Sequence, residues 1–264
     1  MNALQQRVRM PRLEAGMTLV ELMISITIGL FIIGAALMVF QSTSGIGRQI
    51  SEVAQLRQQG ATAFRVIAKQ VSEAGSVEPD YNDENNNFRF ADKFTWTGSS
   101  AIANWTPPTG TDFLSISQQV QTSSDYQALL RNCLGQTVKK SGSDDTTRSS
   151  FYIKPVSGKS YGELMCETGA NDGGQPIISN VAAFKVRYRV RPSATNITAK
   201  QFVDNPTSWG LVDAVEVCLD LVGDRNTPTD DSTYTDCDGD STVSRGNRLH
   251  VVQRSLFTVY SAQR

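Results

Sequence analysis

The sequence predicts an α+β protein in which one long N-terminal helix packs on an antiparallel β-sheet with long loops. Three observations lead to this prediction. An apolar run fills residues 17–40, a helical pattern continues without proline to residue 74, and short segments of alternating polarity follow later in the chain. Because the helix and the strands occupy separate parts of the chain, α+β is favoured over an alternating α/β arrangement.

The apolar run is long enough to cross a membrane. It spans 24 residues with one charged side chain, Glu21, and a helix needs about 20 residues to cross the hydrocarbon core. A carboxylate at mid-bilayer costs about 2.5–3.5 kcal/mol on insertion scales, and less near a helix end. The simplest alternative is a signal anchor whose acid reaches the headgroup level.

The residues before this run are informative. Residues 1–16 are short, polar and basic, with Arg7, Arg9 and Arg12, and they end at Gly16, directly before the apolar run. An ordinary secretory signal has its small-residue cleavage site after the apolar core, so the order here is reversed. The arginines predict that the N-terminus stays in the cytoplasm and that the rest of the chain is exported.

The stretch Gly16-Met17-Thr18-Leu19-Val20-Glu21, which opens the apolar helix, resembles the class III signal of type IV prepilins and of type II secretion pseudopilins. The resemblance implies that a membrane-embedded prepilin peptidase cuts after Gly16 and methylates the new amine of Met17. It also implies that the mature chain polymerises through its N-terminal helix, with Glu21 as the assembly residue. The chain is then a substrate of an enzyme and not an enzyme itself.

Elementary electrostatics supports the same role for Glu21. Cleavage creates a cationic amine at Met17, and a carboxylate and an ammonium at 4 Å attract by about 4 kcal/mol at an effective dielectric constant near 20. Pairing therefore favours docking of the helix in an apolar environment. Whether the amine belongs to the same chain or to a neighbouring subunit is left open by the sequence.

Residues 41–75 are expected to form the exported half of the same helix, about 85 Å long in total. Gly75 is the expected C-terminal stop. A coiled-coil stalk is the alternative, although the heptad register is irregular. The apolar stripe expected to face the sheet contains Ile46, Ile50, Val53, Leu56, Phe64, Ile67 and Val71.

The remaining residues, 76–264, are expected to form one β-rich globular domain. Residues 76–111 are polar and rich in turn-forming residues, which predicts a loop. In 211–222, the acids Glu216 and Asp220 share one face and valines and leucines the other, which predicts a sheet with one face in water. Strands are predicted at 113–120, 151–156, 163–166, 181–190, 211–222 and 249–260.

The later segments DFLSIS, FYI, ELMC and PIISNVAAFKVRYRV, together with the final basic-apolar strand, resemble the PilW family of type IV pilus minor pilins. This resemblance implies a role in pilus assembly or priming, with the peptidase, other minor and major pilins and the inner-membrane assembly platform as partners. It implies an inner-membrane protein with one span and a periplasmic domain, later found in the pilus. The alternatives are a minor pseudopilin of type II secretion and a pilus-displayed module that binds DNA or surfaces.

Cys133, Cys166, Cys218 and Cys237 form no CxxC motif, and the single His250 has no cysteine near it in the sequence, so a zinc site is not expected. In an oxidising periplasm, four cysteines predict two disulfides. Three pairings are open. We favour Cys133 with Cys166 and Cys218 with Cys237, because each pair brackets a loop-rich stretch.

The stretch KVRYRVR places Lys185, Arg187, Arg189 and Arg191 on one face of a strand. Three interpretations are open: a solvated face that discourages edge pairing, a contact with an acidic neighbouring subunit, or a phosphate contact. The whole chain has a formal net charge of -1, so no general basic excess points to nucleic acid. We therefore treat these four residues as a candidate partner-binding strand.

Asp236, Asp238 and Asp240 with Gly239 resemble part of a calcium loop, but the glutamate that ends an EF-hand loop is missing. A disordered or disulfide-tethered loop is the favoured interpretation here, and a solvated loop is favoured for the Asn/Asp cluster at 80–87. No cofactor or metal is expected, with calcium as a minor hypothesis. The sequence also lacks the GxSxG and HExxH motifs, and His250 lies in an apolar strand pattern, so no enzyme is predicted.

Overall fold

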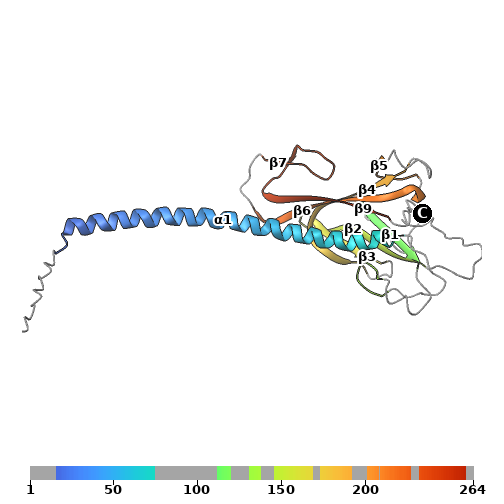
Figure 1. Cartoon of the computed structure of the whole chain (residues 1–264), viewed down its shortest axis with the longest axis horizontal. Helices are drawn as coiled ribbons and strands as arrows, with labels where there is room; N and C mark the ends of the chain where they lie inside the picture. The colour runs from blue at the N-terminus through green and yellow to red at the C-terminus, as the bar shows by residue number, and fades with distance from the viewer. Residues whose placement is uncertain are drawn as a thin grey trace, which may run out of the picture. The chain divides into compact units, whose positions relative to one another are not determined.

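The computed structural model describes residues 16–74, 112–119, 131–137, 146–168, 173–191, 201–207, 209–226 and 232–259. It confirms a long N-terminal helix that packs on an antiparallel sheet (Figure 1). The chain divides into two compact units, residues 1–51 and 52–264. Each unit is considered by itself below.

Helix α1 runs over Leu19–Ser72, 54 residues. Its first turn is capped by Thr18, whose Oγ1 accepts a hydrogen bond from the backbone N–H of Glu21 at 3.3 Å. A threonine followed three residues later by glutamate is the sequence of a capping box, in which the side chain satisfies an N–H that the first turn leaves free. Helix formation therefore begins directly after Met17.

In the first unit, the large apolar side chains of α1 are exposed among the residues that the structure describes. The helix is long and apolar enough to cross a membrane, and none of its most apolar window is buried by the described part of the chain. The predicted apolar stripe was wrong at its start, because Ile46 and Ile50 are 56% and 64% exposed. The stripe that packs on the sheet begins only at the second unit.

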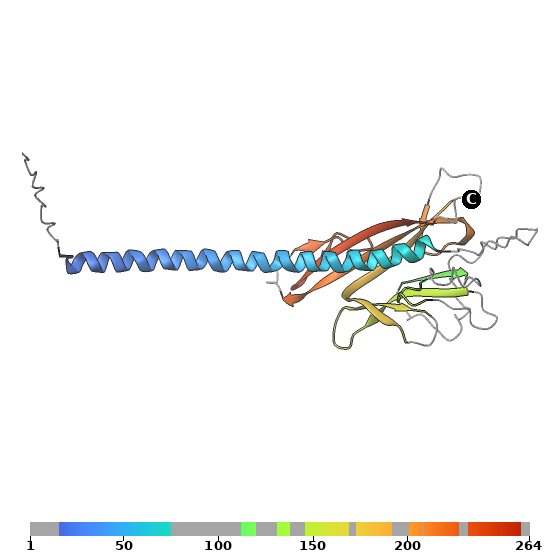
Figure 2. The ribbon, with the colours of Figure 1, turned by 60° about the horizontal axis from the view of Figure 1, so that its bottom comes forward.

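In the second unit, the buried face of α1 repeats every three or four residues, which keeps one face toward the sheet. The ring of Phe64 also packs, in a tilted arrangement, against Phe257 of the sheet, with ring centroids 5.9 Å apart. The cyan end of the helix runs along the orange and red strands in Figure 2. The buried positions are Leu56, Gly60, Ala63, Ile67, Gln70, Val71 and Ala74.

Gly60 is the point of close approach between α1 and the sheet. A Cβ placed on Gly60 would lie 2.5 Å from Nε2 of Gln253. The Gln253 side chain also donates a hydrogen bond to the carbonyl of Leu56 at 3.4 Å. The small residue thus lets a strand side chain reach the helix backbone, which an apolar-stripe pattern does not reveal.

The main sheet has the strand order β1-β2-β3-β4-β6-β9, with β5 also paired to β4, and all pairs are antiparallel. Strands β7 and β8 form a separate hairpin. A 3-10 helix, η1, covers Trp209–Leu211. The strands are β1 Phe113–Gln119, β2 Thr146–Pro155, β3 Gly162–Glu167, β4 Gln175–Val190, β5 Gln201–Val203, β6 Val212–Asn226, β7 Thr233–Tyr234, β8 Val243–Ser244 and β9 Arg248–Thr258.

All six predicted strands are present, as β1, β2, β3, β4, β6 and β9. Strand β4 begins at Gln175 and β2 at Thr146, both earlier than predicted, because Gln175 pairs with β3 and Thr146 pairs with β1. The short strands β5, β7 and β8 were missed, since two or three residues carry no periodic pattern. The loop predicted at 76–111 lies outside the described residues.

Strand β4 joins two halves of the sheet. Its first part pairs with β3 up to Val181, and its second part pairs with β6 from Val181 onward. The change occurs at Asn180, which has a positive φ of 61°, and at a bulge between Val181 and Ala183. A bulge bends a strand and increases its twist, so β4 can serve both halves.

One face of β4, β6 and β9 packs on α1. Val186, Val217 and Ser255 follow one another across the three strands on this face, and Lys185, Cys218 and Arg254 follow one another on the opposite face. The prediction that the opposite face is in water was wrong at Asp220, which is only 2% exposed. The β7–β8 hairpin reaches this carboxylate through Tyr234, a long-range contact that the strand pattern cannot show.

Candidate functional site

The expected processing point lies just outside the helix. Gly16, Met17 and Thr18 are exposed and precede α1. The first helical hydrogen bond runs from the backbone N–H of Leu22 to the carbonyl of Thr18. The Gly16–Met17 peptide bond is therefore free of helical hydrogen bonds and accessible to a peptidase.

Glu21 lies in the first turn of α1, at the start of the apolar run. Its backbone carbonyl accepts a hydrogen bond from Ser25 Oγ at 2.7 Å. Within the part of the chain that the structure describes, no ion pair engages its carboxylate. An acid at a helix N-terminus is favoured by the helix dipole, so the position itself tolerates a charge.

The structure pairs Cys133 with Cys166 and Cys218 with Cys237, with Cα atoms 6.1 and 5.6 Å apart. These are the pairs that the sequence favoured. The first joins the segment 131–137 to β3, and the second joins β6 to the turn between β7 and β8. All four cysteines are buried.

A buried polar cluster beside the first disulfide connects it to α1. The side chain of Gln70 donates to the carbonyl of Arg131 at 2.9 Å and accepts from the hydroxyl of Ser149 at 2.7 Å. That hydroxyl oxygen also accepts from the backbone N–H of Cys133 at 3.1 Å. Gln70 was not predicted to face the sheet, because the predicted helix stripe contains only apolar residues.

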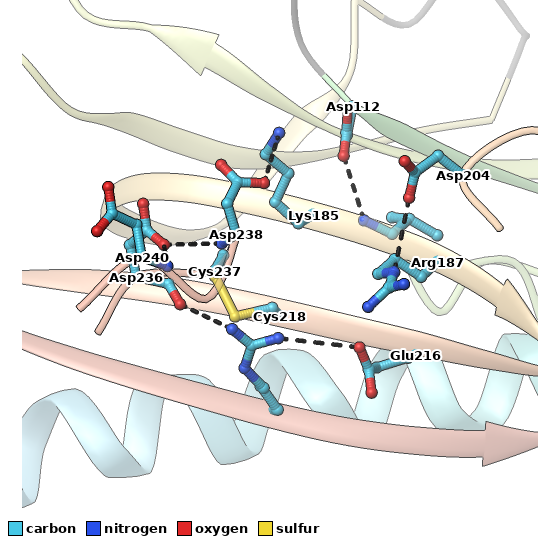
Figure 3. A network of polar contacts seen from close by, with 12 residues as sticks. Asp112, Lys185, Arg187, Asp204, Glu216, Cys218, Asp236, Cys237, Asp238 and Asp240 are labelled. Carbon is cyan, nitrogen blue, oxygen red and sulfur yellow. Dashed lines mark hydrogen bonds and ion pairs between the residues drawn. A yellow bond between two sulfur atoms is a disulfide. The ribbon is translucent and has the colours of Figure 1, made fainter. Parts of the chain in front are cut away.

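Three of the four cations of the candidate partner-binding strand have acidic partners within the chain, and Figure 3 shows those of Lys185 and Arg187. Lys185 Nζ lies 3.2 Å from Asp238, Arg187 Nε lies 3.7 Å from Asp204, and Arg189 Nε lies 2.7 Å from Asp213. Arg191 follows the end of β4 and is partly buried. The side chains of Lys185 and Arg187 are still 39% and 47% exposed, so these ion pairs are compatible with a solvated strand face.

The pKa of Lys185 shows how these charges balance. Burial alone lowers its pKa, but the hydrogen bond with Asp238 and the charges of Asp112, Asp238 and Asp204 together raise the pKa above its ordinary value. Lys185 thus stays cationic in this acidic surrounding. Its positive charge is largely neutralised by the protein itself, which reduces its pull on an external acidic partner.

Asp112 has a structural role that the sequence did not suggest. Its Oδ2 accepts a hydrogen bond from the backbone N–H of Val186 at 3.3 Å. Val186 lies between the part of β4 paired with β3 and the part paired with β5. The carboxylate therefore satisfies a strand N–H at a point where neither of these strands pairs with β4.

The candidate calcium residues use their oxygens within the protein. Asp236 Oδ1 accepts from the backbone N–H groups of Asp238 and Asp240, at 2.9 and 3.0 Å. Hydrogen bonds from Thr242 lower the pKa of Asp240. Among the residues that the structure describes, no group of three or more His, Cys, Asp and Glu is arranged to hold a metal ion. The cluster at 80–87 lies outside these residues.

A further polar cluster lies under the β7–β8 hairpin. Asp220 accepts hydrogen bonds from the hydroxyl of Tyr234 at 2.8 Å and from Nδ1 of His250 at 3.1 Å. The rings of Tyr234 and His250 are stacked, with centroids 4.4 Å apart. The pKa of Tyr234 is raised above its ordinary value, mainly by burial and next by the hydrogen bond to Asp220. His250 is thus a partly buried strand histidine, and no local sequence signal links it to Tyr234.

Comparison with known proteins gives one sequence match and a weak structural likeness. The prokaryotic N-terminal methylation motif matches residues 11–37. A type IV-like pilin from Thermus thermophilus is 10% identical, with a TM-score of 0.40 over 79% of this chain and 97% of that chain. No curated protein sequence matches the chain.

The methylation motif at residues 11–37 is followed by a long apolar helix whose later part packs on an antiparallel sheet. This is the arrangement that the sequence predicted for a pilin-like chain. The motif also implies processing by a prepilin peptidase and partners in pilus assembly.

Proposed function

We propose that this chain is a minor pilin subunit of the PilW type, acting in the assembly or priming of a type IV pilus. The observation that carries the proposal is the methylation motif at residues 11–37, at the start of an apolar helix whose first unit is not covered by any of the described residues. Such a surface is stable only in lipid or among other apolar helices. Both environments occur in the life of a pilin, first in the membrane and then in the filament.

In this proposal, the peptidase cuts the exposed Gly16–Met17 bond on the cytoplasmic side and methylates the amine of Met17. The arginines of residues 1–16 keep the N-terminus in the cytoplasm, and residues 17–40 form the single span of the inner membrane. Residues 41–264 are then periplasmic, where an oxidising environment suits the two observed disulfides. The subunit later leaves the membrane for the pilus.

Glu21 acts in the proposed polymerisation. Its carboxylate lies one turn from Met17, and no side chain among the described residues neutralises it. A Met17 amine at about 4 Å would contribute about 4 kcal/mol at an effective dielectric constant near 20. If that amine belongs to a neighbouring major or minor pilin, the pair fixes the axial register between subunits.

The exported domain supports this role through its rigidity. Residues 52–72 of α1 are held on the sheet by apolar packing and by the hydrogen bonds of Gln70 and Gln253. The ion pairs of Lys185, Arg187 and Arg189 within the chain disfavour the alternative in which β4 is a free cationic surface for DNA.

The test is the mass of the intact protein and of its N-terminal peptide, taken from membranes with and without an active prepilin peptidase. We expect a chain that begins at methylated Met17 only when the peptidase is active. An unprocessed N-terminus in both cases would contradict the proposal and leave a signal-anchored periplasmic domain.

A second measurement distinguishes a pilus from a type II secretion system. Deletion of the gene is expected to reduce the number of surface pili and to leave protein secretion unchanged. Loss of secretion with normal piliation would instead make the chain a minor pseudopilin. Both results are compatible with processing at Gly16, so this measurement is independent of the first.

A further inference from the structure

The β7–β8 hairpin lies on the sheet face opposite α1. We call residues 232–244 the lid; they comprise β7, the turn with Asp236–Asp240, and β8. The lid is joined to the main sheet by the Cys218–Cys237 disulfide. Strands β7 and β8 pair only with each other among the described strands, so backbone hydrogen bonding to the main sheet does not hold them there.

Noncovalent contacts also hold the lid. Tyr234 donates its hydroxyl to Asp220 at 2.8 Å and stacks on His250. Because a carboxylate only accepts, Nδ1 of His250 carries the hydrogen that points at Asp220. Asp220 is therefore shared between a strand histidine and a lid tyrosine, and it is 2% exposed.

Two contacts made by the turn also attach the lid to the main sheet (Figure 3). Asp238 pairs with Lys185 of β4 at 3.2 Å, and the carbonyl of Asp236 accepts from Arg254 of β9 at 2.7 Å. Lys185 and Arg254 both lie opposite Cys218 in the strand register. The turn thus spans three strands around the disulfide.

We propose that the lid is a redox-sensitive element with two locks, the Cys218–Cys237 disulfide and a latch formed by Tyr234, Asp220 and His250. The latch keeps the lid closed when the disulfide is broken, and the lid opens only when both locks are released. Opening withdraws Asp238 from Lys185, the Asp236 carbonyl from Arg254 and Tyr234 from Asp220, and so exposes these three polar side chains of the sheet. While closed, the latch also keeps Cys237 beside Cys218, which favours re-formation of the same disulfide.

The redox step is a thiol–disulfide exchange with a dithiol. The dithiol gives two electrons and two protons to the Cys218–Cys237 bond, which becomes two thiols, while the dithiol becomes a disulfide. Cys218 and Cys237 are 2% and 4% exposed in the closed lid. Access to the sulfur atoms limits this exchange, so a closed lid also slows the reduction.

The experiment measures amide hydrogen exchange of residues 232–244 in the full chain in detergent, for four proteins. These are the unchanged chain, Cys218→Ala/Cys237→Ala, Tyr234→Phe, and the triple variant. A hydrogen bond to a charged group contributes about 1.5–3 kcal/mol, so removal of the latch without the disulfide is expected to speed exchange by about 10-fold or more. Either change alone is expected to have a much smaller effect.

Tyr161→Phe is the matched control. It removes another buried tyrosine hydroxyl, one that approaches Arg248 and not the lid. Peptides from β1 to β3 report whether each variant is folded, and His250→Gln gives a second way to weaken the latch if Tyr234→Phe fails this check.

The proposal is overturned if Cys218→Ala/Cys237→Ala alone exchanges lid amides as fast as the triple variant, because the latch would then hold nothing. An equal effect of Tyr161→Phe in the disulfide-free background would also overturn it. Alkylation of the reduced thiols should follow the same order, with Cys237 modified faster in Tyr234→Phe than in the unchanged chain.

Discussion

At the scale of single residues, Glu21 has a local role in the helix and, in the proposed assembly, an intermolecular one. Locally it takes the third position of a capped first turn, next to Thr18. That role requires only its backbone N–H, so the carboxylate stays available to a Met17 amine. The two roles can therefore be separated by substitution.

We expect Glu21→Gln to be processed at Gly16 as before and to enter pili at least 10-fold less. The amide keeps the size and the backbone hydrogen bond of glutamate, but it loses an attraction of about 4 kcal/mol to the amine. Immunoblots of sheared pili and of membranes measure incorporation and processing separately. Ser25→Ala, which removes a hydroxyl one turn later, is the control, and normal incorporation of Glu21→Gln would argue against charge pairing.

Tyr188 predicts a decrease in stability at alkaline pH. Burial, then the charge of Asp112, raises the pKa of this phenol, so the folded protein keeps a proton that the unfolded chain loses near pH 10. The contribution of Tyr188 to the free energy of unfolding is therefore fully present below pH 10 and is lost as the pH rises above it.

The slope from this one group is about 1.4 kcal/mol per pH unit. Tyr188→Phe should lose less stability between pH 10 and 11.5 than the unchanged chain. Urea unfolding followed at several pH values gives both slopes. Identical slopes would mean that Tyr188 ionises alike in both states.

At the scale of elements, β4 depends on a residue with a left-handed backbone. Asn180 has a φ of 61°, and its side-chain amide donates to Asp224 Oδ1 at 2.7 Å. Asparagine tolerates this conformation better than β-branched residues do. The side chain and the backbone together fix the point at which β4 passes from β3 to β6.

Asn180→Val is expected to destabilise the domain by about 1–3 kcal/mol, the usual cost of a residue held in an unfavourable φ/ψ region. Asn180→Gly relieves the backbone but loses the Asp224 hydrogen bond, so it should cost less than Asn180→Val. Thermal unfolding of the three proteins checks this order. If glycine is as harmful as valine, the hydrogen bond and not the backbone conformation determines the effect.

At the scale of the whole molecule, the two disulfides are expected to differ in what they stabilise. Cys133–Cys166 closes a loop with a sequence separation of 33 and lies in the core, whereas Cys218–Cys237 has a separation of 19 and holds the lid. Chain-entropy estimates give about 3–4 kcal/mol for each, with the longer loop favoured by about 0.5 kcal/mol.

Replacing Cys133 and Cys166 by alanine should therefore lower the unfolding midpoint of the whole domain more than replacing Cys218 and Cys237. The second replacement should act mainly on hydrogen exchange within the lid. Denaturant unfolding and exchange, measured on both double variants, test this division. The opposite order of midpoints would show that the lid supports the whole domain.

The sequence by itself determined the N-terminal methylation motif, the long helix and the six longer strands. These features arise from local patterns: Gly16 before an apolar run, and side chains that alternate along a strand, as in 211–222. The apolar length and the single acid at Glu21 also need no tertiary contact to be recognised. Local chemistry was enough for the class of protein.

Only the tertiary structure decided which faces are covered and which charges are paired. Ile46 and Ile50 continue the apolar pattern yet stay exposed, while Gln70 and Asp220 are polar yet buried. Lys185 pairs with Asp238, and Arg187 pairs with Asp204. Burial and ion pairing depend on segments far apart in the chain that meet only on folding, so a pattern of neighbouring residues cannot fix them.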